Sequence, residues 1–96
     1  MELEYSWSST PNGVYYSLRC RPKNSQLDRW DAVATLFKRH EGDTWRASFN
    51  WCIERLLPHG AYIFRKRWDD IDKAKKAVER KARGMVGVLQ ILGEWP

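Results

Sequence analysis

The sequence predicts an α+β fold, in which a small antiparallel β-sheet is packed by one long C-terminal helix. Residues 2–21 alternate between apolar and polar side chains on both sides of an Asn-Gly pair, which is typical of a β-hairpin. Residues 71–92 repeat apolar side chains at helical spacing. The segment between them has room for one to three further strands and for a second helix. A chain of 96 residues suits one domain, residues 1–96, with one modest core.

The N-terminal hairpin has the most regular strand pattern. Its first strand places Leu3, Tyr5 and Trp7 on one side. Residues 10–13, with the sequence Thr-Pro-Asn-Gly, form the expected turn. The second strand, residues 14–21, alternates again, with Val, Tyr, Leu and Cys pointing inward. Its outward side chains are Tyr15, Ser17, Arg19 and Arg21.

Two segments in the middle of the chain fit both helix and strand. Residues 26–40 begin near a Ser-Gln-Leu-Asp sequence that resembles a capping box, and apolar residues follow at helical spacing. Alternate residues within this segment also fit a strand, but we expect a second helix here. Residues 44–57 are equally ambiguous. For them we expect a strand that ends at Trp51, followed by a helical turn.

The C-terminal third predicts a short strand followed by the long helix. Residues 61–68 are rich in aromatic and β-branched side chains. The Asp pair at 69–70 is suited to cap the helix and to complement its dipole. We expect the helix to continue through Gly84 and Gly87; the alternative is a stop at the first glycine and a final strand. The expected apolar face comprises Ile71, Ala74, Val78, Ala82, Met85, Leu89 and Leu92.

The positive charge is concentrated in one segment. The chain has a net charge of +5 and a pI of about 9.5. Residues 62–83 hold nine basic and four acidic side chains, whereas the rest of the chain holds eight of each. Such a segment attracts polyanions and acidic protein surfaces, although it also fits a merely solvated helix face. The expected partner-binding residues are Arg65, Lys66, Arg67, Trp68, Lys73, Lys76, Arg80 and Arg83.

The sheet offers a secondary candidate surface, provided that residues 14–21 and 44–51 are both strands. Open sheet faces with aromatic and basic side chains bind single-stranded nucleic acids. The alternative is that these are ordinary outward positions of a sheet. The secondary surface comprises Tyr15, Arg19, Arg21 and Arg46.

The chain contains no motif that predicts catalysis or a cofactor. Cys20, Cys52, His40 and His59 lack the close ligand pairs of zinc modules, so we expect neither a metal nor a cofactor. Both cysteines are expected to be buried free thiols, with a disulfide between them as the alternative. No defensible nucleophile–base arrangement is visible, and we expect a protein that is not an enzyme.

Two partner classes fit a compact, basic chain with six tryptophans, of which we expect one or two at the surface. In style, although not in any motif, the chain resembles small proteins of phages and mobile elements that block host nucleases, polymerases or defence complexes. This resemblance implies an inhibitor or adaptor that engages a host protein or complex, including nucleic-acid-handling machinery, through the basic segment. The alternative is a nucleic-acid-binding module that uses the same residues.

The sequence also predicts where the protein acts. No apolar run reaches the ~18 residues that a membrane span requires. The first residues, Met-Glu-Leu-Glu, do not resemble a secretory signal. We therefore expect a cytoplasmic protein without membrane contact, and the oligomeric state stays open.

Overall fold

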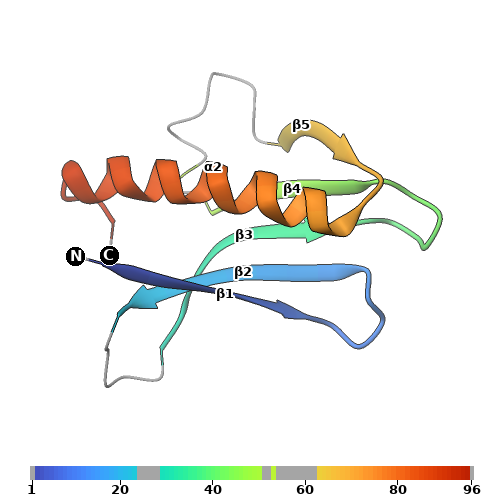
Figure 1. Cartoon of the computed structure of the whole chain (residues 1–96), viewed down its shortest axis with the longest axis horizontal. Coiled ribbons are helices and arrows are strands. Elements are labelled where there is room, and N and C mark those ends of the chain that lie inside the picture. The colour runs from blue at the N-terminus through green and yellow to red at the C-terminus, as the bar shows by residue number, and fades with distance from the viewer. Residues whose placement is uncertain (1, 24–28, 51–52, 54–62, 96) are drawn as a thin grey trace.

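The computed structural model describes residues 2–23, 29–50, 53 and 63–95. Within them the elements are β1 (Leu3–Ser9), β2 (Tyr15–Pro22), β3 (Asp31–Phe37), β4 (Trp45–Phe49), β5 (Ile63–Trp68) and α2 (Ile71–Ile91). The five strands form one antiparallel sheet in chain order. The helix α2 crosses one face of this sheet in front of β3 and β4, with β5 along one flank and β1 and β2 along the other (Figure 1). The α+β prediction is confirmed, with three strands added to the hairpin.

The N-terminal hairpin forms as its alternation predicts. Strands β1 and β2 pair from Leu3 opposite Pro22 to Ser9 opposite Tyr16. Gly13 closes the turn with a φ of 70°, a conformation that is costly for residues with a side chain. The preceding Asn side chain accepts a hydrogen bond from the backbone N–H of Val14 at 3.2 Å. Local chemistry is therefore sufficient to set the register of this hairpin.

The predicted helix over 26–40 is wrong, because residues 31–37 form the central strand β3. Residues 26–28 lie outside the described residues. Strand β3 pairs with β2 on one side and with β4 on the other. The backbone hydrogen bonds of two neighbouring strands thus outweigh the helical spacing of its apolar residues.

A β-bulge in β3 explains why its sequence looks helical. Leu18 of β2 pairs with Ala34, but the next residue, Arg19, pairs with Ala32, so Val33 is the extra residue. Both Val33 and Ala34 are buried. Two consecutive inward residues break the alternation of a regular strand and imitate the spacing of a helix.

The ambiguous segment that begins at residue 44 forms strand β4, as expected. Trp45, Ala47 and Phe49 are buried and alternate with partly exposed residues. Apart from Ile53, which is buried, the expected helical turn after Trp51 falls outside the described residues, as does Trp51 itself.

The long helix α2 continues through both glycines, as predicted. Asp70 caps its N-terminus, and its side chain accepts a hydrogen bond from the backbone N–H of Asp72 at 3.3 Å. Gly93, with a φ of 71°, lies just beyond its C-terminus. The predicted apolar face is correct except at Leu92, which is exposed; Met85 is half-buried and packs against the core, and the buried Val86 adds to this face. The buried helix residues are Ala74, Val78, Ala82, Val86 and Leu89.

The core lies between α2 and the sheet and includes Cys20, a fully buried free thiol. Cys52 lies outside the described residues. Among the described tryptophans, Trp45 is buried and Trp7, Trp30, Trp68 and Trp95 are half-buried. Trp51 lies outside the described residues, so the expectation of one or two tryptophans at the surface stays a prediction. Trp95 packs against the core, so the described part of the C-terminal segment is held against the rest of the fold.

Gly84→Ala and Gly87→Ala are each expected to raise the free energy of unfolding by about 0.5–1 kcal/mol. Both glycines lie inside α2, where alanine is the better helix former. A Cβ added at either position meets no atom of the described residues within 4 Å. Thermal unfolding followed by circular dichroism measures the change, and a lower Tm for both variants would contradict it.

Candidate functional site

The cations of α2 are divided between its two flanks. On the flank that faces β1 and β2, the Lys75 Nζ lies 4.4 Å from the ring centroid of Tyr16, and the Arg83 Cζ lies 4.3 Å from that of Tyr5. Arg83 also approaches Glu79, with 3.9 Å between Nη2 and Oε1. In these cation–π contacts, the long cationic side chains of α2 cover the rings of Tyr5 and Tyr16. Arg83, a predicted partner-binding residue, is therefore engaged in holding α2 to the hairpin.

Tyr5 lies where this flank meets the core. Burial raises the pKa of its hydroxyl, and the Cys20 thiol raises it further. The Arg83 guanidinium lowers the pKa, and Glu79 opposes Arg83. Burial dominates, so the phenol stays neutral and acts as a packing group.

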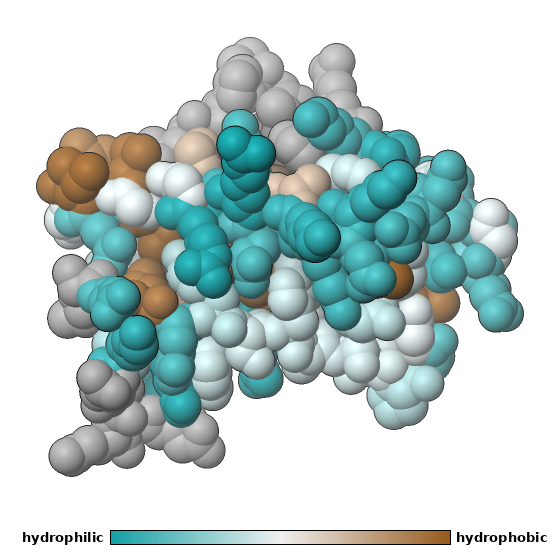
Figure 2. Space-filling model, in the orientation of Figure 1, coloured by the Kyte–Doolittle hydropathy of each residue, from teal (hydrophilic) through white to brown (hydrophobic). Residues whose placement is uncertain are grey.

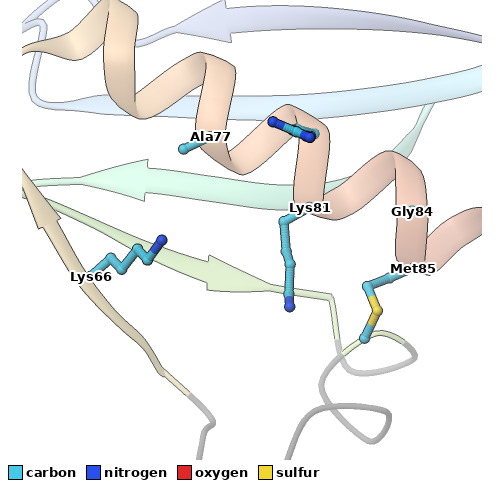
Figure 3. A pocket seen from close by; sticks show the side chains of 6 residues that line it. Lys66, Ala77, Lys81, Gly84 and Met85 are labelled. Carbon is cyan, nitrogen blue, oxygen red and sulfur yellow. The ribbon is translucent and has the colours of Figure 1, made fainter.

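The opposite flank of α2 forms a groove against β5. Its volume is about 630 Å³, and its described lining holds three cations and no carboxylate. Lys81 and Met85 extend from α2 into this space and Lys66 extends from β5 (Figure 3). The described lining residues are Lys66, Ala77, Arg80, Lys81, Gly84 and Met85. Ala77 and Gly84 keep the helix surface low between the longer side chains, which leaves room for a partner side chain.

An exposed apolar cluster, defined as Val88, Ile91 and Leu92, continues this surface toward the C-terminal end of α2. Their exposed fractions are 45%, 87% and 58%. Val88 and Leu92 are three and seven residues beyond Met85 and so share its side of the helix. Figure 2 shows hydrophobic side chains gathered at this end of the helix, next to the hydrophilic surface of its middle part. The groove and the apolar cluster therefore form one continuous surface, called the groove surface below.

The structure brings only part of the predicted basic segment to the groove. Lys66 and Arg80 line it. Lys73 and Lys76 are exposed nearer the N-terminus of α2. Arg67 is exposed on β5, where its Nη1 donates to the backbone carbonyl of Lys66 at 3.1 Å.

Two other predicted residues of β5 do not add to this surface. Trp68 pairs with Trp45 across the strands and packs partly buried against the core, so it does not offer a free ring for stacking. The backbone of Arg65 lies within β5, but its side chain lies outside the described ones.

Sequence reasoning missed Lys81 and the apolar cluster. The prediction places Leu92 on the core face and counts Lys81 only in the net charge, whereas Met85 both packs against the core and lines the groove. The signal that was available is the spacing of Ala77, Lys81, Gly84 and Val88, which fall on one side of a helix next to the core stripe. Which side of α2 faces solvent depends on where β5 lies, and the helix sequence alone does not contain that information.

The secondary surface lies on the open face, defined as the side of the sheet opposite α2. Three neighbouring rows of cross-strand pairs on this face are Tyr15–Phe37–Arg46, Ser8–Ser17–Thr35–Ser48 and Ser6–Arg19–Ala32. The predicted Arg21 alternates with the buried Cys20 and lies on the same face in a further row, where it pairs with Glu4 of β1 and stacks on Trp30 at 4.2 Å. All four predicted residues thus share the open face, and three of them, Tyr15, Arg19 and Arg46, have no carboxylate partner among the described residues.

The described ranges contain two surfaces with the charge and exposure that a partner requires, the groove surface and the open face. In the same ranges, His, Cys, Asp and Glu side chains do not gather in groups of three that could hold a metal ion. The described helix is not long and apolar enough to cross a membrane. Comparisons of the chain with protein-family models, with curated proteins and with solved structures give no match.

Proposed function

We propose that this protein is a non-enzymatic binding protein that engages an acidic surface of another protein, as an inhibitor or adaptor acting on a host protein or complex. The groove surface is the proposed contact. The observation that carries the proposal is the continuity of the cationic groove with the exposed apolar cluster at the end of α2.

The apolar cluster favours a protein partner over a nucleic acid at this surface. Contacts to phosphates require cations and hydrogen-bond donors, and they would leave Ile91 and Leu92 in water. Protein interfaces instead bury apolar side chains at their centre and place polar groups at the rim. A partner segment with a carboxylate beside an apolar side chain would complement both parts of the groove surface.

The exposed lysines of the first half of α2 have a different expected role. Lys73 and Lys76 lie outside the groove lining and are exposed to solvent. Cations at the rim attract an acidic partner over a distance, which raises the association rate more than the lifetime of the complex. Replacing them is therefore expected to change the salt dependence of association.

The proposal is tested by affinity capture from the lysate of the source organism, with nuclease-treated and untreated samples side by side. The variants are Arg80→Ala with Lys81→Ala in the groove and Ile91→Ser with Leu92→Ser in the apolar cluster. Because a protein interface uses both parts, each pair is expected to weaken binding of the recovered protein at least about tenfold, or about 1.4 kcal/mol. Titration of the recovered protein against each variant measures this loss.

The control removes two positive charges elsewhere, with Lys23→Ala and Arg29→Ala, and is expected to bind like the wild type. Lys23 lies just past β2, where its Nζ is 3.6 Å from Glu2 Oε2, and Arg29 is exposed. Two outcomes would contradict the proposal. The first is loss of all partners on nuclease treatment. The second is full binding by the apolar-cluster variant together with loss in the groove variant, because that pattern indicates a polyanion.

A further inference from the structure

The middle of the open face is polar. Ser8, Ser17, Thr35 and Ser48 form a row of four hydroxyl side chains across β1 to β4. These side chains are small and partly exposed. Rows that carry an arginine flank this row on both sides. A chain running from one arginine to the other would therefore cross the hydroxyl row midway and meet a guanidinium group on each side of it.

Two arginines of the open face have unused donors. The Nε atoms of Arg19 and Arg46 are buried and have no hydrogen-bond partner. A buried donor without a partner costs free energy, which an anionic acceptor would recover once the side chain turns toward it. The outward carboxylates of β1 do not supply one, because Glu4 pairs with Arg21 and Glu2 pairs with Lys23. The face is thus electrostatically complementary to an anion that comes from outside the described residues.

Aromatic rings lie on both sides of the hydroxyl row. On one side, Tyr15 is 44% exposed and pairs across the strands with Phe37, which is half-buried. On the other side, the Arg19 guanidinium lies 5.7 Å from the ring centroid of Trp30. Exposed rings next to arginines bind unpaired bases by stacking, while the arginines bind the phosphates.

We propose that the open face binds single-stranded RNA. Arg19 and Arg46 bind phosphates, Tyr15 stacks on a base, and the hydroxyl row hydrogen-bonds the ribose 2′-hydroxyls that distinguish RNA from DNA. Strand geometry separates the two arginines by about 14 Å along the strands and about 10 Å across them. That span suits the two or three bases that other open sheets stack.

The charge of this face opposes two other occupants. A second copy of the chain docked face to face would place Arg19 and Arg46 against the same arginines of its partner, which is repulsive. An acidic peptide would satisfy the arginines but would leave the hydroxyl row and Tyr15 without partners of matching chemistry. Single-stranded RNA uses all three features. The proposal is independent of the proposed function, because it concerns the opposite side of the molecule.

The test is the fluorescence anisotropy of a labelled oligouridylate of about eight nucleotides, titrated with protein at several salt concentrations. Arg19→Gln with Arg46→Gln is expected to lower affinity at least about tenfold and to reduce the salt slope by about 1.4, the value for two single-strand phosphate contacts. Tyr15→Ala is expected to lower affinity about tenfold through lost stacking. Because Tyr15 is exposed, this variant tests the face even if the arginine pair impairs folding.

The matched control is Lys73→Gln with Lys76→Gln, which removes the same charge from α2 and is expected to bind within about twofold of the wild type. An equal loss in this control would overturn the proposal, because it would show a response to net charge alone. Undiminished binding by Tyr15→Ala, or no binding by the wild type at low salt, would overturn it as well. Equal affinity for an oligothymidylate of the same length would overturn the assignment to RNA. Protein capture by the groove surface is not expected to change in the open-face variants, so the two proposals can fail separately.

Discussion

Leu36→Ala is expected to lower the free energy of unfolding by about 2–5 kcal/mol. Leu36 lies in the central strand β3, has no exposed surface, and belongs to the core between the sheet and α2. Its cross-strand neighbours are Tyr16 of β2 and Ala47 of β4. Neighbours on paired strands cannot easily close around the missing atoms, so the variant loses the burial of the side chain and keeps a cavity. Such a loss is a large share of the total stability of a small domain.

Urea unfolding followed by tryptophan fluorescence measures this change, since the core contains the indole of Trp45. The control is Ile91→Ala, which truncates a side chain that is 87% exposed. It is expected to change the free energy of unfolding by no more than about 0.5 kcal/mol. Equal losses in the two variants would contradict the position of the core.

Stability is expected to decrease at alkaline pH because of Cys20. Burial, with a smaller contribution from Asp31, raises the pKa of its thiol from 9.0 to about 11, although a hydrogen bond with Trp95 lowers it. The folded state therefore holds the thiol proton more tightly than the unfolded state. This contribution is fully present below pH 9 and is lost as the pH rises to about 11. Two pKa units correspond to a loss of up to about 3 kcal/mol.

The measurement compares the free energy of unfolding at neutral pH and near pH 11 for the wild type and for Cys20→Ala. The variant is less stable at neutral pH because it loses buried volume, but it lacks the titrating thiol. Its stability is therefore expected to fall less between the two pH values. Parallel pH dependences would show that Cys20 does not titrate in the way its burial implies.

Much of the candidate site can be predicted from charge and periodicity. Lys66 and Arg80 belong to the segment that carries the net positive charge, and both line the groove. Arg19 and Arg46 follow from strand alternation and share the open face. The pairing of Arg21 with Glu4 follows from the hairpin register, which places these two residues opposite each other on β1 and β2.

The division of the α2 cations was decided by tertiary structure. Arg83 contacts the ring of Tyr5, a residue that lies far away in the sequence. Lys81, which is only two residues away, lies on the other flank and lines the groove. A helical period places these two side chains on different sides, but only the positions of β1, β2 and β5 determine which side packs and which stays open.

The sequence by itself determined the elements whose signals are local. The hairpin follows from alternation around Gly13, and α2 follows from its Asp70 cap and its apolar period. Strand β3 was decided by the tertiary structure, because its apolar residues fit a helix and a bulged strand equally well. Its conformation depends on β2 and β4, which satisfy its backbone hydrogen bonds on both edges. Hydrogen bonds between distant segments stabilise a strand only after those segments have come together. The apolar pattern within one segment therefore does not reveal them.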